Sequence, residues 1–211
     1  MARPSGATLP QIARIGIFGG TFDPVHVGHL VAAVNARHAL HLDRVLLVVA
    51  NEPWQKVGLR AVTPAADRLA LVAAGVEGVD GLEASSIEID RGGASYTADT
   101  VAALEVANPG AELFLLAGAD VVADLESWER VEEIWPRVTL VVVSRPGAPA
   151  MRPGRGGPLE GWRVVFVEIP SLDISSTDLR ERAASGRPLD YLVPSAAVRL
   201  IAERGLYHAG I

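Results

Sequence analysis

Short apolar runs alternate along the chain with longer segments whose apolar residues recur at helical spacing. Six runs have the length of buried strands, at residues 12–17, 44–50, 82–89, 112–117, 138–143 and 163–168. Helical patterns occupy residues 30–40, 63–76, 96–106, 121–135, 176–184 and 195–204. Because β and α patterns alternate, the sequence predicts an α/β fold with a doubly wound, parallel sheet.

Residues at the ends of the helical segments support these boundaries. Thr63 is expected to cap a helix whose first position is Pro64 and which ends near Gly78. The segment 96–106 stops at the Asn-Pro-Gly run 108–110, and Pro136 interrupts or ends the segment 121–135.

The chain is expected to form a single domain. Its 211 residues are enough for one substantial core, and no internal repeat is present. Residues 1–12 are expected to be disordered, residues 145–161 form a loop rich in Pro and Gly, and residues 175–211 form a C-terminal helical part.

Composition narrows the class of protein. Hydrophobic residues make up 49% and charged residues 21% of the chain, as in soluble globular proteins. The net charge of -6 provides no basic field for nucleic acid. Cysteine is absent, which excludes disulfides and thiolate zinc sites. No run approaches the ~18 apolar residues of a membrane span, and the N-terminus lacks the apolar core of a signal peptide. A cytoplasmic enzyme is expected.

The most informative segment follows the first apolar run and spans residues 16–29, GIFGGTFDPVHVGH. A strand, a glycine turn and a helix start are typical of a phosphate site, since glycines admit an anion and the helix start offers free N–H groups. His26 and His29 are three residues apart, so both imidazoles lie on one helix face and can donate hydrogen bonds to phosphate oxygens.

Two other interpretations of this segment are weaker. A metal-binding histidine pair lacks nearby Cys and an evident third ligand, so no metal site is predicted. A dinucleotide-binding protein would carry the G-x-G-x-x-G fingerprint, which the glycines at 16, 19 and 20 do not match.

A second polar group, residues 173–180, opens a late helix. Ser175 or Ser176 can cap it, and Thr177 or Asp178 lies in its first turn. Taken alone, this pattern is that of a simple capped helix. However, four polar groups follow predicted strands, at residues 19–29, 51–56, 118–120 and 171–180. In a parallel sheet such groups converge on one crevice at the carboxyl edge.

Both groups resemble signatures of one family. Residues 19–29 resemble the first signature of the His-x-Gly-His nucleotidyltransferases, and Ile-Ser-Ser-Thr at 174–177 followed by Arg180 resembles the second. The resemblance implies a Rossmann-like nucleotidyltransferase fold in which the following residues bind ATP: Gly19, Gly20, Thr21, Phe22, His26, His29, Gly118, Asp120, Ile174, Ser175, Ser176, Thr177 and Arg180.

The middle of the chain narrows the resemblance to bacterial nicotinate-nucleotide adenylyltransferases. Pro53-x-x-Lys56, the run 95–100 (SYTADT), Gly-x-Asp at 118–120 and Trp128 all resemble elements of that family. The resemblance covers nearly the whole chain. Gln55 replaces the His that many relatives carry before the lysine, as in actinobacterial members.

The resemblance also implies roles for these residues. Tyr96 and Thr97 would contact the nicotinate carboxylate, Trp128 would stack on the pyridine ring, and Lys56 would lie near the mononucleotide. Asp120 would face the adenylate ribose. Without the family, Lys56 is equally well a solvated loop lysine and Trp128 a core residue.

The implied reaction transfers the adenylyl group of ATP to nicotinate mononucleotide, giving nicotinate adenine dinucleotide and pyrophosphate. Since the acceptor phosphate is already an anion, neither a general base nor a covalent enzyme intermediate is expected. His26, His29 and Arg180 would stabilise charge at the phosphates. Mg²⁺ would arrive on the ATP phosphates, which needs no carboxylate cage.

Three alternatives stay open from the residues alone. A nicotinamide-mononucleotide enzyme would differ by one hydrogen-bond donor in its substrate. A pantetheine-phosphate adenylyltransferase shares the first signature but lacks the SYTADT-like segment. A nucleotide sensor without turnover would be expected to lack the histidines or Arg180. The sequence also leaves open whether the protein is a homo-oligomer.

Overall fold

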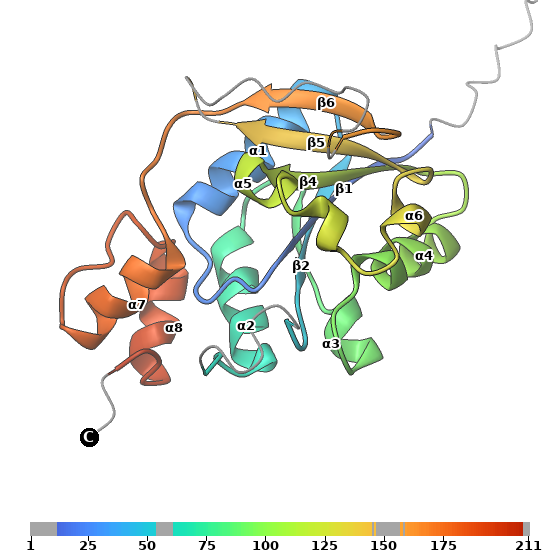
Figure 1. Cartoon of the computed structure of the whole chain (residues 1–211). Coiled ribbons are helices and arrows are strands. Elements are labelled where there is room, and N and C mark those ends of the chain that lie inside the picture. The colour runs from blue at the N-terminus through green and yellow to red at the C-terminus, as the bar shows by residue number, and fades with distance from the viewer. Residues whose placement is uncertain (1–11, 54–60, 145, 147–156, 158, 209–211) are drawn as a thin grey trace, which may run out of the picture.

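The computed structural model describes residues 12–53, 61–144, 146, 157 and 159–208 of the chain. Six strands form one parallel sheet in the order β3-β2-β1-β4-β5-β6. The strands are β1 (Arg14–Gly20), β2 (Arg44–Val49), β3 (Leu82–Ser85), β4 (Glu112–Gly118), β5 (Val138–Ser144) and β6 (Arg163–Glu168). The strand order reverses between β1 and β4, at the centre of the sheet (Figure 1). Ligands of doubly wound sheets bind at such a switch point.

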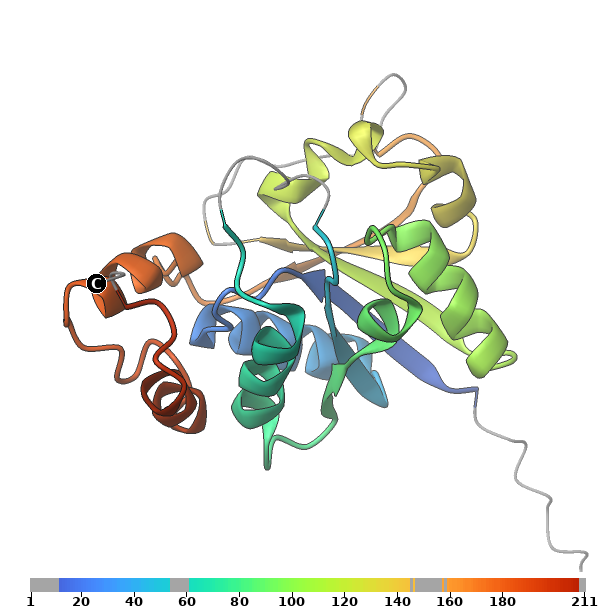
Figure 2. The same ribbon diagram turned by 90° about the horizontal axis from the view of Figure 1, so that it is seen from below.

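Helices cover both faces of this sheet (Figures 1 and 2). They are α1 (Val27–Leu40), α2 (Ala65–Val76), α3 (Ile87–Arg91), α4 (Thr97–Ala107), α5 (Ala119–Val122), the 3₁₀ helix η2 (Leu125–Ser127), α6 (Val131–Ile134), α7 (Ser176–Ala184) and α8 (Ser195–Glu203). Among the helices of the described ranges, none has the length and apolarity that a membrane crossing requires.

Two hydrophobic cores lie against the sheet, one on each face, and β2 contributes side chains to both. In β2, Val45, Leu47 and Val49 join the core beneath α1, α2, α7 and α8. Leu46 and Val48 point the other way, into the core beneath α4, η2 and α6. This alternation follows from the pleat, and it explains why the central strands are apolar at successive positions.

The predicted strand over residues 82–89 is wrong in its second half. Only Leu82–Ser85 is a strand, and Ile87–Arg91 forms the short helix α3. Ile87 and Ile89 alternate as strand residues would, but they contact the two different cores. The backbone amide of Asp90 donates to the carbonyl of Ser86 at 2.8 Å, which closes a helical turn.

The predicted capping of α2 is also wrong. Pro64, not Thr63, is the N-cap, and the helix begins at Ala65. The carbonyl of Thr63 instead accepts a hydrogen bond from Arg68 Nε at 2.7 Å. The segment 121–135 contains helix as predicted, in short separate pieces. The loop expected over residues 145–161 and the disorder expected over residues 1–12 lie mostly outside the described residues.

Candidate functional site

Two pockets open next to each other at the carboxyl edge of the sheet, where β1 and β4 end. The larger, about 770 Å³, contains His26, His29 and Arg180 and is called here the histidine pocket. The smaller, about 330 Å³, contains Tyr96, Thr97 and Trp128 and is called the tryptophan pocket. The pockets share six lining residues, which are Phe18, Gly19, Gly20, Thr21, Gly118 and Val121. The predicted convergence on one crevice therefore holds for residues of the groups 19–29, 118–120 and 171–180, which line the histidine pocket. Pro53 of the group 51–56 lines the tryptophan pocket, and residues 54–56 lie outside the described residues.

The two histidines stack at the start of α1. Their ring centroids are 3.7 Å apart and the planes differ by 25°. His26 is the N-cap and is largely buried, and its backbone amide donates to His29 Nδ1 at 3.2 Å. Because Nδ1 of His29 accepts this bond, the proton of a neutral imidazole belongs on Nε2, which can donate to a ligand. Phe22 contacts the His29 ring edge-on, at 5.0 Å between centroids.

Helix α7 completes the histidine pocket from the other end of the sequence. Arg180 Nη1 donates to the carbonyl of Asp23 at 2.7 Å, and Ser176 Oγ donates to the carbonyl of Pro24 at 2.9 Å. Ser175 is the cap, as its Oγ accepts from the amide of Asp178 at 3.1 Å. Loop 23–24 and α7 are thereby joined although the paired residues are 152 and 157 positions apart in the sequence.

Several predicted ATP-binding residues of this region line the histidine pocket, namely Ile174, Ser176, Thr177 and Arg180. The N-termini of α1 and α7 both lie at this pocket. Each presents backbone N–H groups and the positive end of a helix dipole. Together with the guanidinium of Arg180, they make a cradle suited to a polyphosphate, although the whole chain is acidic.

Tyr207, in the segment that follows α8, reaches the same loop. Its hydroxyl donates to Asp23 Oδ1 at 2.9 Å, and Asp23 is 1% exposed. Burial raises the pKa of the Tyr207 phenol well above its usual value, so the hydroxyl keeps its proton and remains a donor at neutral pH. The C-terminal region thus holds the loop before α1 through three side chains, those of Ser176, Arg180 and Tyr207.

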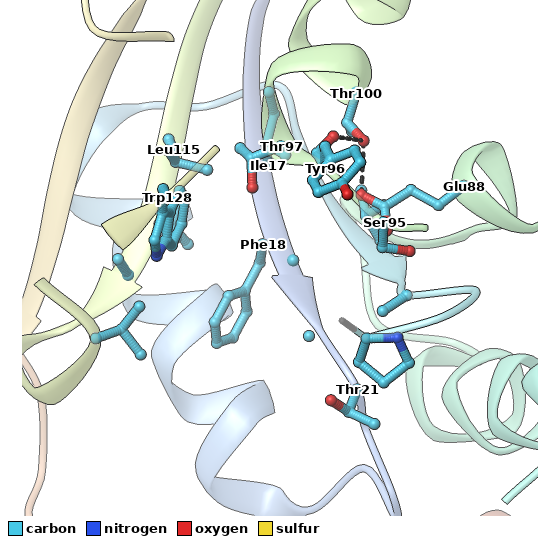
Figure 3. Close-up of a pocket in the computed structure, with 18 of the residues that line it drawn as sticks. Ile17, Phe18, Thr21, Glu88, Ser95, Tyr96, Thr97, Thr100, Leu115 and Trp128 are labelled. Carbon is cyan, nitrogen blue, oxygen red and sulfur yellow. Dashed lines mark hydrogen bonds between the residues drawn. The ribbon is translucent and has the colours of Figure 1, made fainter. Parts of the chain in front are cut away.

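The tryptophan pocket lies on the other side of β1, between α4 and the segment after η2. Figure 3 shows Trp128 on one side of the view and Tyr96 on the other, with Thr97 near the middle and Phe18 lower down. Ser95 Oγ accepts a hydrogen bond from the amide of Asn51 at 2.8 Å, which fixes the chain just before α4. An aromatic face opposite polar groups is an arrangement that can hold a flat ring with a polar substituent.

Sequence reasoning missed Glu88, which lines this pocket, and Arg130, which lies beside the lining residue Tyr96 without lining the pocket itself. Glu88 is largely buried, lines the pocket and accepts a hydrogen bond from Thr100 Oγ1 at 2.6 Å. The sequence pattern predicts a strand at this position, whereas Glu88 belongs to α3 and is buried. Arg130 pairs with Asp99 at 2.5 Å and lies 5.9 Å from the centre of the Tyr96 ring. The hydrogen bond to Asp99 raises the pKa of Arg130 further above its usual value. The carboxylate of Asp99, one turn into a predicted helix, was the signal for such a partner.

Some predicted residues are not placed by these observations. Lys56, with Trp54 and Gln55 before it, lies outside the described residues. Asp120 belongs to α5 directly after β4, and only its backbone is described. Within the described ranges, no group of three or more His, Cys, Asp or Glu side chains could hold a metal ion.

Known proteins resemble this chain over nearly its whole length. The family model for cytidylyltransferase-like proteins matches residues 17–182. A Corynebacterium kroppenstedtii protein named "Probable nicotinate-nucleotide adenylyltransferase" is 45% identical over 95% of this chain and 93% of its own. A Streptomyces coelicolor protein of the same name is 46% identical over 90% of this chain and 98% of its own.

Solved structures share the fold. Plasmodium falciparum nicotinic acid mononucleotide adenylyltransferase, complexed with NaAD, superposes with a TM-score of 0.75 at 16% identity, covering 92% of this chain and 97% of that one. A putative nicotinate-nucleotide adenylyltransferase from Vibrio parahaemolyticus gives a TM-score of 0.67 at 20% identity, covering 94% and 98%. The predicted α/β fold of the nucleotidyltransferase type is confirmed. On its sequence similarity to the bacterial relatives, the chain belongs to the nicotinate-nucleotide adenylyltransferase family, within the cytidylyltransferase-like proteins.

Proposed function

We propose that the protein adenylylates nicotinate mononucleotide with ATP, forming nicotinate adenine dinucleotide and pyrophosphate for NAD biosynthesis. The observation that carries this proposal is the junction of two different pockets at Gly19–Thr21. One pocket offers an anion cradle and the other an aromatic face opposite polar groups. A nucleoside triphosphate in the first pocket and a pyridine mononucleotide in the second would meet at this shared wall, where a phosphate of one could reach the other. The relatives bear the name of this activity.

In this reaction an oxygen of the mononucleotide phosphate attacks the α-phosphorus of ATP. The bond from the α-phosphorus to the α,β-bridging oxygen breaks, and its electron pair leaves with pyrophosphate. The protein supplies alignment and charge stabilisation. We assign the stabilisation to His26, His29 and Arg180, aided by the helix starts of α1 and α7. Of the remaining predicted ATP ligands, Gly118 would border the nucleotide and Asp120 would face its ribose.

The acceptor occupies the tryptophan pocket in this proposal. Trp128 stacks on the pyridine ring, and the start of α4 at Tyr96 and Thr97 meets the nicotinate carboxylate through hydroxyl and backbone N–H groups. The pocket volume of about 330 Å³ suits the base end of a mononucleotide. Lys56 is assigned to the mononucleotide on family resemblance.

Adenylyltransferases of this family take ATP with a divalent cation. We propose Mg²⁺, carried into the site on the polyphosphate. This suits an ion that keeps several waters and takes few protein ligands.

We further propose a cytoplasmic location, in keeping with a reaction of central metabolism.

Pyrophosphate release with Mg-ATP tests the function directly. Nicotinate mononucleotide, nicotinamide mononucleotide and 4′-phosphopantetheine are compared as acceptors at equal concentration. A marked preference for nicotinate mononucleotide is the expected result. Preference for another acceptor would refute the assignment of the tryptophan pocket. Binding of ATP with no turnover on any acceptor would identify a nucleotide sensor instead.

Loss of the Asp99–Arg130 ion pair should weaken acceptor binding. In Arg130→Met, this ion pair no longer attaches the segment that contains Trp128 to α4, the helix that contains Thr97. We expect the KM for nicotinate mononucleotide to rise roughly 5-fold, about the strength of a partly exposed ion pair. The KM for ATP should stay unchanged. Arg137→Met is the matched control, because Arg137 also pairs with α4, through Glu105 at 3.6 Å, but at the opposite end of that helix from Tyr96 and Thr97. Equal effects of both variants on the acceptor KM would contradict this prediction.

A further inference from the structure

Arg68 is an ionisable side chain buried in α2, with a relative exposure of 1%. A buried guanidinium is stable only where its N–H groups are satisfied by acceptors. Arg68 lines neither the histidine pocket nor the tryptophan pocket. It therefore has no assigned part in binding either substrate, yet it lies under the carboxyl edge of the sheet where both pockets open.

The guanidinium donates to backbone carbonyls from three separate segments. Nε bonds to the carbonyl of Thr63 at 2.7 Å, before α2. Nη1 bonds to the carbonyl of Thr21 at 2.8 Å, in the loop after β1. Nη2 bonds to the carbonyl of Asn51 at 3.1 Å, after β2. One side chain thus fixes the distances between the loops that follow two adjacent strands.

Two of these carbonyls connect Arg68 to the pocket walls: that of Thr21, which is a lining residue, and that of Asn51, which lies between the lining residues Ala50 and Pro53 of the tryptophan pocket. Thr21 lines both pockets. Asn51 continues to the start of α4, because its amide donates to Ser95 Oγ at 2.8 Å and its side-chain amide donates to the carbonyl of Gly93 at 2.9 Å. A continuous series of hydrogen bonds therefore runs from the loop after β1, through Arg68 and Asn51, to the segment that carries Tyr96.

We infer that Arg68 is a positioning residue which holds the two substrate pockets at the spacing that adenylyl transfer requires. This inference rests on the proposed function. The guanidinium suits the task because its planar fork places three donors in fixed directions, toward three carbonyls. A lysine would keep the charge but present a single ammonium, which cannot satisfy the same three directions. The two pockets should respond together to a change at this residue.

The test compares Arg68→Lys and Arg68→Met with the control Arg204→Met. Arg204 joins the same helix by pairing with Asp67 at 2.6 Å, remote from both pockets. Thermal unfolding, kcat and both KM values are measured for each protein, with calorimetric affinity for α,β-methylene ATP. Arg68→Lys should remain folded and raise both KM values roughly 10-fold, with a lower kcat, since small displacements of reacting groups are costly. Arg68→Met should be less stable than Arg68→Lys, with higher KM values and a lower kcat. Arg204→Met should change only the thermal stability.

Two kinetic outcomes would overturn the inference. Arg68→Lys could lose stability while both KM values stay within twofold of the parent protein, which would make the residue purely structural. A change confined to one substrate would show that Arg68 does not link the pockets. If the parent protein turned over a different acceptor, or none, the proposed function would fail separately. The affinity of Arg68→Lys for α,β-methylene ATP would then decide the inference, with parental affinity refuting it.

Discussion

Replacing His29 with alanine should lower kcat by ~10²–10³-fold and change the KM for ATP only modestly, as for loss of a preorganised donor in other enzymes. Nδ1 of His29 is engaged by the amide of His26, so Nε2 is oriented before substrate arrives. A donor fixed in this way stabilises charge that grows on the phosphates during the reaction, without a cost for reorientation.

The measurement is steady-state pyrophosphate release over a range of ATP concentrations. His38→Ala is the control, because His38 lies on the same helix and is exposed at its far end. His26→Ala should also lower kcat, and the double variant should be less impaired than the product of the single effects, because the stacked rings act together. If His29→Ala changed KM alone, the histidine would bind ATP without acting on the transition state.

Arg180→Lys should reduce kcat/KM for ATP by ~10²-fold, in the range seen when one preorganised donor is lost. Arg180 holds the carbonyl of Asp23 with Nη1 and Thr177 Oγ1 with Nη2, so its fork is fixed at the mouth of the cradle. Lysine preserves the charge but loses this planar geometry, and it can bridge the loop and a phosphate less well. The acceptor KM should change little.

Arg182→Lys provides the comparison for that experiment. Arg182 lies half a turn further along α7 and pairs with Asp178 at 2.6 Å, within its own helix. Its replacement should leave kcat/KM for ATP near the parental value. A loss of similar size in both variants would mean that stability of α7, and not the contacts of Arg180, determines the rate.

Much of the fold and of the histidine pocket could be predicted from residues that lie close together in the sequence. Residues 16–29 carry their own strand, turn and helix start, so the site could be inferred from neighbours in sequence. The second signature followed from family resemblance, and its contact with the first depends on tertiary structure. No sequence pattern indicates the hydrogen bonds that Ser176 and Arg180 donate to loop 23–24.

What the sequence could not predict follows from contacts made at long range or through the backbone. The three partners of Arg68 are carbonyls, and every residue type offers a carbonyl, so no motif marks them. Glu88 was misassigned because Ile87 and Ile89 fit both a strand and a short helix between two cores. The end of β3 is decided by those cores, which form only in the folded chain.

The attachment of α7 to loop 23–24 has a consequence for the order of events during synthesis. Helix α7 follows every strand of the sheet in the chain, and Tyr207 follows later still. The polyphosphate cradle is therefore complete only after α7 has been synthesised and has packed on loop 23–24. The core on that face of the sheet is completed at the same stage, because α7 and α8 contribute buried side chains to it.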